Sequence, residues 1–358
     1  MAAVLGAGAG RAAPRLELQY FHDVKDSRFV ILDLAFFSPR QGVAVGYLSE
    51  NGRTRPYSVA TSNGGETWTP VPIREPGTSL FVLNETVGWM VGEQGLWKTV
   101  EAGRSWQRLT KEKKMLRVWF VDESRGWAVG RQKSVWETKD GGRRWTVLPV
   151  AAEPNTSPEY TNYTWIEFFG RLRGAISGHS EPPRRSVSPL PDWMDPERAP
   201  REWPGSAIVI QTLDGGNTWK PITTSMFGRI TRLRLRGQGP GLALVQFRHS
   251  FEWPSEVYLI DLAANSTERV FREKDRSITD VLFTADGRAW LGGFEPVGTM
   301  SETPVPGRVV LLHSADLKKW EGVAVDYRAV AKRVTLAASG NELWAATDTG
   351  MILKLARE

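Results

Sequence analysis

The sequence predicts an all-β protein: a seven-bladed β-propeller of four-stranded antiparallel blades, its ring closed by an N-terminal strand joining the C-terminal blade. Three observations favour this fold. A turn motif ending in tryptophan recurs along the chain, and short apolar strands of similar register accompany it. The last repeat is one strand short, and an alternating segment near the N-terminus can supply the missing strand.

The recurring motif reads Thr-Ser-Asn-Gly-Gly-Glu-Thr-Trp at residues 61–68 and returns at 99–106, 138–145 and 212–219. A shorter form without glycine stands at 314–320. A short Asp or Asn side chain accepts backbone N–H groups inside a turn, and glycine supplies the positive φ that the turn needs. We therefore interpret the motif as a structural Asp-box hairpin and not as a reaction centre. Its structural residues are Asn63, Trp68, Glu101, Trp106, Asp140, Trp145, Asp214, Trp219, Asp316 and Trp320.

The spacing of the motif tryptophans sets the number of blades. Successive spacings are 38, 39, 74 and 101 residues, and a blade takes ~40–45 residues. The third spacing therefore holds one blade with an insertion at 180–205, and the fourth holds two blades. Seven blades fit better than six or eight. The expected blades are 30–72, 78–110, 115–149, 162–223, 229–272, 277–324 and a last one from about Ala329 to Glu358.

The last blade contains only three strands before the chain ends. Residues 15–20 alternate apolar and polar side chains, so we expect them to form its outer strand and tie the first blade to the last. A single propeller then spans 15–358. Residues 1–14 are small and apolar, and we interpret them as a disordered arm or the remnant of an export signal. On that basis we predict an exported protein, in a periplasmic, lumenal or extracellular compartment.

Composition excludes several classes of function. The sequence has no Cys, which rules out disulfides, thiol catalysis and Cys-ligated metals, and its four His are too scattered to indicate a metal site. No apolar run approaches the ~18 residues of a membrane-spanning helix. The net charge of +6 favours an acidic partner or an anionic surface, but no nucleic-acid-binding signature accompanies it. We expect a monomer without metal, cofactor or nucleic acid.

Longer connections indicate the binding face. Relative to the second blade, four blades lengthen the connection between their second and third strands, at 47–56, 180–205, 248–256 and 295–308. Such connections all emerge on one face of a propeller, and insertions on one face usually mark the binding side. The longest insertion carries Trp193 and Trp203 amid several arginines. Its candidate partner-binding residues are Arg184, Arg185, Trp193 and Trp203, of the types that dominate interface hot spots. Alternatively, the tryptophans anchor the loop to the rim.

Arginines also gather on the predicted inner strand of the fifth blade. Arg232, Arg234 and Arg236 alternate there and cannot all be buried without partners. Either they line the central channel as an anion-binding ladder, or they reach acidic groups on an adjacent blade. The links between blades add further cations: Lys111, Lys113, Lys114, Arg269, Arg272, Lys274 and Arg276.

The segment Gly126-Trp-Ala-Val-Gly-Arg131, followed by the box at 138–145, resembles the photosystem II assembly and stability factor family. At the level of repeats, the resemblance covers about 31–355. It implies a lumenal or periplasmic propeller that binds a newly made membrane subunit through an arginine patch. Arg131 is the one position matched to that patch. The insertion 180–205 and the extended loop in the sixth blade depart from the compact family pattern.

The sequence also allows two other classes of function. Asp-box propellers also resemble sialidases, whose sites need a tyrosine nucleophile, carboxylates and an arginine cluster. The Arg-Ile-Pro signature of those enzymes is absent, and we interpret Glu93 and Asp348 as turn residues. Aromatic side chains in the long insertion would also suit a glycan- or cell-surface-binding propeller. We predict a non-catalytic propeller that acts as a scaffold or assembly chaperone for a protein partner, such as a membrane-protein subunit or its loop.

Overall fold

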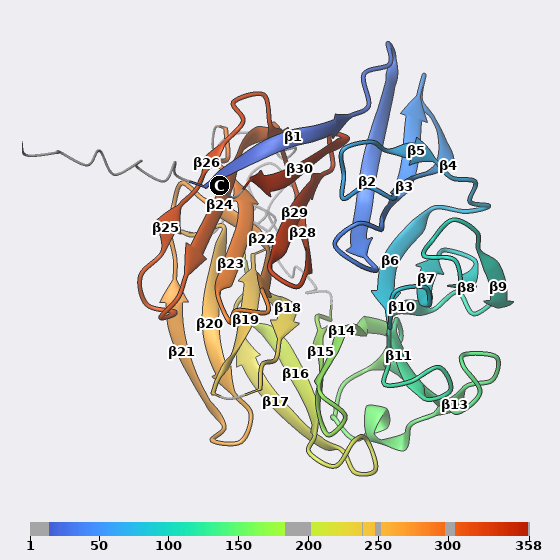
Figure 1. Ribbon diagram of the computed structural model, residues 1–358. Coiled ribbons are helices and arrows are strands. Elements are labelled where there is room, and N and C mark those ends of the chain that lie inside the picture. Colours follow the sequence, from blue (N-terminus) through green and yellow to red (C-terminus); the bar gives the residue numbers. More distant parts are fainter. Residues whose placement is uncertain (1–13, 183–201, 238, 248–251, 298–304, 357–358) are drawn as a thin grey trace, which may run out of the picture.

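Seven antiparallel sheets are arranged radially about a central axis (Figure 1). The structure, a computed structural model, describes residues 14–182, 202–237, 239–247, 252–297 and 305–356. In every sheet the first strand of the repeat is innermost and the following strands run outward as a meander. The predicted fold class and the count of seven blades are confirmed.

Blades one to four follow the predicted boundaries closely. Blade one consists of β2 (Ser27–Phe36), β3 (Gly42–Glu50), β4 (Arg53–Thr61) and β5 (Thr69–Pro70). Blade two consists of β6 (Gly77–Val82), β7 (Gly88–Gly92), β8 (Gly95–Thr99) and β9 (Gln107–Thr110). Blade three consists of β10 (Met115–Phe120), β11 (Gly126–Gly130), β12 (Ser134–Thr138) and β13 (Thr146–Val147). Blade four consists of β14 (Thr161–Phe169), β15 (Arg173–Ser180), β16 (Gly205–Thr212) and β17 (Lys220–Met226).

Two short 3₁₀ helices, η1 (Pro149–Ala152) and η2 (Pro158–Tyr160), lie in the link between blades three and four. Blade five consists of β18 (Arg229–Arg234), β19 (Gly241–Gln246), β20 (Ser255–Asp261) and β21 (Ser266–Phe271). Blade six consists of β22 (Ser277–Phe283), β23 (Ala289–Phe294), β24 (Gly307–Ser314) and β25 (Glu321–Gly322). Blade seven contains β28 (Val334–Ser339), β29 (Glu342–Thr347) and β30 (Met351–Ala356). None of the helices among these described residues is long and apolar enough to span a bilayer.

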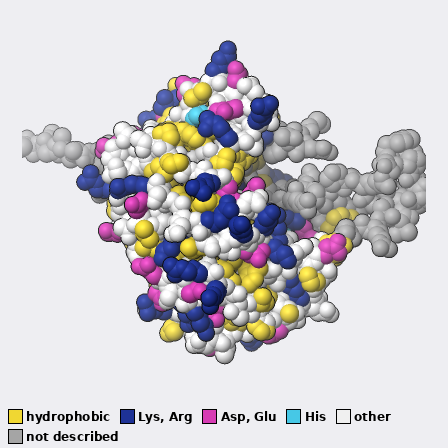
Figure 2. Space-filling view, turned by 90° about the vertical axis from the view of Figure 1, so that its right-hand side faces the viewer, with side chains coloured by type: hydrophobic (Ala, Val, Ile, Leu, Met, Phe, Trp, Pro, Cys, Tyr) yellow, Lys and Arg dark blue, Asp and Glu magenta, His cyan; other side chains and the backbone are white. Residues whose placement is uncertain are grey.

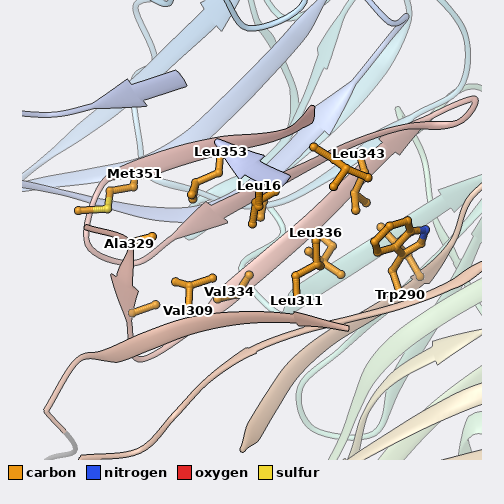
Figure 3. Close-up of a cluster of buried hydrophobic side chains, with 14 residues drawn as sticks. Leu16, Trp290, Val309, Leu311, Ala329, Val334, Leu336, Leu343, Met351 and Leu353 are labelled. Carbon is orange, nitrogen blue, oxygen red and sulfur yellow. The ribbon is translucent and has the colours of Figure 1, made fainter. Parts of the chain in front are cut away.

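The N-terminal strand closes the ring as predicted. Strand β1 (Arg15–Phe21) pairs antiparallel with β30, and Leu16 lies opposite Leu355. Leu16 is completely buried in a cluster that joins blades six and seven (Figure 3). Two further pairings were not predicted. Strand β26 (Ala324–Val325) runs parallel to the start of β1, and β27 (Val330–Ala331) pairs with β24, so the link into blade seven covers the outer edge of β1.

Stacked aromatic rings join adjacent blades. A tryptophan on the second strand of one blade lies on a phenylalanine from the inner strand of the next. Ring centroids are 3.7 Å apart for Trp89 and Phe120, and 3.5 Å apart for Trp344 and Phe36 across the closure. The indole N–H of Trp89 also donates to the Gly141 carbonyl in the neighbouring box. The box therefore stabilises the contact between blades as well as its own turn.

The Asp boxes lie on the face opposite the inserted loops. In blade three, one oxygen of Asp140 accepts the backbone N–H groups of Arg143 and Arg144 at 3.0 and 2.9 Å. The Gly141 N–H donates to the carbonyl of Ser124, in the turn between the first and second strands. Equivalent bonds join the box to that turn in blades one, two and four. Because the second-to-third connections leave the sheet at its other end, the two sets of loops occupy opposite faces.

One predicted insertion is not a loop. Residues 47–56 continue β3 and β4 as a hairpin, in which Tyr47 lies opposite Pro56 and Glu50 opposite Arg53. Asn51 and Gly52, at φ 48° and 76°, form the two-residue turn. Blade one is thus taller than its neighbours because its strands are longer.

Glu101 replaces Asp in the box of blade two and loses the capping geometry. Its carboxylate accepts the Ser105 hydroxyl, whereas Asp214 in blade four accepts two backbone N–H groups, from Asn217 and Thr218. We expect Glu101→Asp to restore these backbone bonds and to raise the free energy of unfolding by about 0.5–1.5 kcal/mol. Urea denaturation measures the change. The reverse substitution, Asp214→Glu, is the matched control and should lower stability; an equal effect of both would contradict this role of the box.

Candidate binding surfaces: the channel and the basic strip

The inner strands of all seven blades line a cavity of about 620 Å³ on the central axis. Its lining residues come mainly from the later half of each inner strand, which leads into the first-to-second-strand turn. Charged side chains are frequent in this lining, although the strands that carry them are otherwise largely apolar. The charged residues are Asp33, Arg117, Glu167, Arg232, Arg234, Asp280 and Arg333.

Backbone bulges present several of these side chains to the channel. Six inner strands, β2, β6, β10, β14, β18 and β22, each shift register once against the second strand of their own blade. The residues just after the shift include Asp33, Arg117, Arg232 and Asp280. A bulge re-aims a side chain that regular alternation would direct elsewhere. The repeated bulge thus places charge at one level of the channel.

The three carboxylates hold neighbouring blades together. Asp33 accepts the N–H of Leu80 in blade two at 2.8 Å, and Asp280 accepts the N–H of Leu336 in blade seven at 2.9 Å. Glu167 accepts the N–H of Leu235 in blade five at 3.0 Å. Each acid therefore satisfies a backbone donor on the next inner strand.

Arg232 and Arg234 reach acidic groups on adjacent blades, the second of the two alternatives raised by the sequence. Arg232 Nε lies 3.0 Å from Asp280 on blade six, and an Arg234 terminal nitrogen lies 3.0 Å from Glu167 on blade four. Burial raises the pKa of Glu167, while Arg234 acts in the opposite direction. Arg236 lies beyond the end of β18, in the following turn, with its guanidinium 5.4 Å from the centre of the Phe283 ring. The expectation of three equivalent arginines on the strand is therefore wrong for Arg236.

Two channel arginines were missed in the sequence. Arg117 stacks on Trp165 at 3.5 Å, and Arg333 donates to the carbonyl of Ile31 at 2.8 Å. Burial lowers the pKa of both, to about 10 for Arg117. A single charge in an otherwise apolar strand was the available signal, as in Met-Leu-Arg-Val-Trp-Phe at 115–120.

Arg131 lies outside the channel, on the face of the second-to-third-strand turns. It is exposed, and its backbone N–H donates to the carbonyl of Lys114 at 2.9 Å. In the neighbouring turn, the Gln94 N–H donates to Glu75, next to exposed Arg74. A continuous run of exposed cations therefore crosses blades two and three, which we call the basic strip. It comprises Arg74, Lys111, Lys113, Lys114 and Arg131.

The basic strip is unneutralised, in contrast to the link between blades five and six. Within the described part of the chain, no carboxylate lies within 4.0 Å of a charged side-chain nitrogen of the strip, although Glu112 accepts the backbone N–H of Lys114. The cations of the other link are paired: Arg269 and Arg272 with Glu256, Lys274 with Glu252, and Arg276 with Glu273. Figure 2 views the outer side of blades one to three and shows clusters of Lys and Arg side chains among fewer acidic ones. The two links look alike in sequence but differ in ion pairing.

The structure describes only the two ends of the long insertion. Arg184, Arg185 and Trp193 lie outside the described residues. Trp203 is half-buried just before β16, and its neighbour Glu202 accepts the N–H of Gly228. The structure thus separates the predicted site residues into a surface group with Arg131 and a channel group with Arg232 and Arg234.

Comparison with known proteins connects this geometry to one group of propellers. No family model matches the chain. Photosystem II assembly protein Ycf48 of Synechococcus sp. (strain JA-3-3Ab) is 27% identical over 189 residues, which are 48% of this chain and 53% of that protein. The chain therefore matches about half the length of that relative.

The solved structure of YCF48 bound to a D1 peptide superposes on 99% of this chain and 100% of its own, with a TM-score of 0.60 and 16% identity. YCF48 from Cyanidioschyzon merolae covers 96% of this chain and 98% of its own, at a TM-score of 0.57 and 16% identity. The chain resembles Ycf48 in both sequence and fold. The resemblance predicted from the sequence is confirmed. The fold is shared more widely: the WD40 propeller of Doa1 superposes at a TM-score of 0.58 with 9% identity and 96% of this chain covered.

Asp33 and Asp280 form a matched pair for testing the channel. Both bond backbone N–H groups of their own and the next blade, but only Asp280 also holds an arginine, Arg232. We expect Asp33→Asn to lower the free energy of unfolding by about 1–3 kcal/mol through one lost acceptor. Asp280→Asn also leaves Arg232 without its anion, so its cost should be about 3–5 kcal/mol. Guanidinium denaturation measures both; equal losses would show that the ion pair contributes nothing.

Proposed function

We propose that this chain is a non-catalytic, exported propeller that binds a segment of a membrane protein and assists its assembly, as the resemblance to Ycf48 suggests. The observation that carries the proposal is the basic strip on the face of the inserted loops. Five exposed cations lie together there without bound carboxylates. The partner segment is therefore acidic. The relative is a photosystem II assembly protein, whereas the proposal for this chain names a membrane protein in general.

The surroundings of Arg131 support a preformed surface. The ammonium of Lys133, in the same turn, donates to the carbonyls of Ala152, Pro154 and Thr156 in the link between blades three and four. Three carbonyl acceptors hold that link against the turn that bears Arg131. A fixed link beside exposed cations reduces the ordering cost of binding an extended segment.

Blades two and three have short turns on this face. Gly92 and Gly95 lie opposite each other across the β7–β8 turn, and Gly130 lies opposite Ser134 across the β11–β12 turn. The strip is therefore not covered by an insertion of its own blades, while the insertion of blade four begins one blade away, after Ser180. An exposed basic surface without an insertion of its own suits an extended peptide better than a compact substrate.

The channel supports binding over glycoside hydrolysis. Its carboxylates are occupied by backbone donors and arginines, and none of the residues described as lining it is a tyrosine. Asp348, one of the acids considered for catalysis, accepts the N–H groups of Lys332 and Arg333 as a turn residue. A chromogenic sialoside assay should give no turnover. Turnover that disappears on Glu93→Ala would contradict the non-catalytic proposal.

Charge reversal of the strip tests the proposed function. The triple variant Lys113→Glu, Lys114→Glu and Arg131→Glu inverts the charge of the surface without touching a described ion pair. We expect it to weaken binding of an acidic membrane-protein peptide at least tenfold and to leave the melting temperature unchanged, since exposed charges contribute little to stability. Fluorescence anisotropy measures this, with an acidic peptide and the D1 peptide that YCF48 binds as separate probes. Mass spectrometry identifies membrane subunits that co-purify with the chain.

The matched control is Lys318→Glu with Lys319→Glu, which changes two exposed lysines in the box of blade six on the opposite face. This control should retain binding. Binding by the wild-type chain should also weaken as salt rises, because exposed charges are screened beyond ~10 Å at 0.1 M ionic strength. Equal capture by the triple variant and the wild-type chain, or capture of glycans alone, would refute the proposal.

A further inference from the structure

We propose that the central channel contains a binding site for a small oxyanion, with Arg117 as the main ligand and Arg333 contributing from blade seven. The site is separate from the basic strip, and the inference does not rest on the proposed function. Four guanidinium groups line the cavity, against three carboxylates. A singly charged anion would balance this excess of one positive charge.

In the described parts of the chain, the hydrogen bonds of the three carboxylates go to backbone N–H groups, to Trp165, to Arg232 and to Arg234, and none goes to Arg117 or Arg333. Both oxygens of Asp33 accept backbone N–H groups. Asp280 accepts two backbone N–H groups and Arg232, while Glu167 accepts Leu235, Arg234 and the Trp165 indole. Acceptors inside the channel are therefore scarce relative to donors.

The guanidinium of Arg117 contacts Trp165 through its flat face and not through the N–H groups along its edge. Its guanidinium lies 3.5 Å from the centre of the Trp165 ring, and Arg232 and Arg234 lie 4.7 and 4.9 Å from the same ring. Stacking fixes the plane of a guanidinium but leaves its N–H groups, which lie in that plane, free to donate. Among the described residues, no hydrogen-bond acceptor or carboxylate pairs with Arg117. A planar or tetrahedral oxyanion is the ligand that such a donor edge takes bidentately.

Arg333 adds a second set of donors. One terminal nitrogen donates to the Ile31 carbonyl, and no carboxylate of the described chain lies within ion-pair distance. Arg117 and Arg333 both line the cavity, and Asp33, Asp280 and Arg232 act on the pKa of each. The cavity of about 620 Å³ has room for an oxyanion together with water.

The charged form of Arg117 is disfavoured in the fold, since burial and the neighbouring arginines lower its pKa. Arg117→Gln removes this unfavourable charge but also the contact with Trp165, so the melting temperature in chloride buffer does not by itself identify a ligand. The response to oxyanions separates a ligand from a structural residue, and Arg117→Gln should lose that response. An arginine needed only for packing would give the opposite result, with the response retained.

The experiment compares sodium acetate and inorganic phosphate with sodium chloride at constant ionic strength, by calorimetric titration and thermal unfolding. The wild-type chain should bind the oxyanions and gain melting temperature relative to chloride, because a ligand of the native state stabilises it. Arg117→Gln should raise the dissociation constant at least tenfold. The control Arg40→Gln changes an exposed arginine outside the channel and should behave as wild type.

A pair of peptides, one with a free and one with an amidated C-terminus, identifies the source of the anion. Binding of acetate and phosphate indicates a free small anion, and binding confined to the free C-terminus indicates the end of a partner chain. If Arg117→Gln fails to fold, Arg117→Lys replaces it and should weaken binding, since a point charge loses the bidentate geometry. The site would be overturned if no oxyanion and no free C-terminus had a larger effect than its control. It would also be overturned if the variant and the wild-type chain responded equally.

Discussion

The closure of the ring by β1 is the constraint on which the rest of the structure depends. Pairing of β1 with β30 places a strand from the start of the chain in the last blade, and Leu16 is fully buried there among residues of blades six and seven. The same inter-blade contact, a tryptophan on a phenylalanine, then recurs from Trp89 and Phe120 to Trp344 and Phe36. A closed ring fixes the distance of every inner strand from the axis, so side chains from all seven inner strands share one cavity.

The fold could be predicted from the sequence because its signals are local. A box such as Thr138 to Trp145 encodes its own turn, and the spacing between boxes encodes a blade. The contents of the channel could not be predicted in the same way. The contact between Arg117 and Trp165 depends on bulges in two separate blades. The periodicity of the sequence does not show where a bulge shifts the register by one residue. The short strand β26 was missed because two residues carry no pattern.

The candidate site was predicted in part. Arg131 was identified through a motif, and it lies on an exposed face beside Lys114, whose charge the sequence also showed. Whether a cation is paired depends on which residues lie near it in space. The sequence therefore named the cations of both links together and could not separate the paired from the unpaired ones. Arg272 and Lys113 look equivalent in the chain, but only Arg272 has a carboxylate, Glu256, within 3.1 Å. The free charge of the strip was visible only once the blades were placed.

The central claim is that the partner occupies the basic strip and not the face of the boxes. Hydrogen–deuterium exchange of the chain with and without its bound partner segment tests this claim most directly. We expect slower exchange in the turns and links at 71–77, 110–115 and 130–134, with the box turns unchanged. Protection confined to the box turns at 61–68, 99–106 and 138–145 would place the partner on the opposite face and contradict the account.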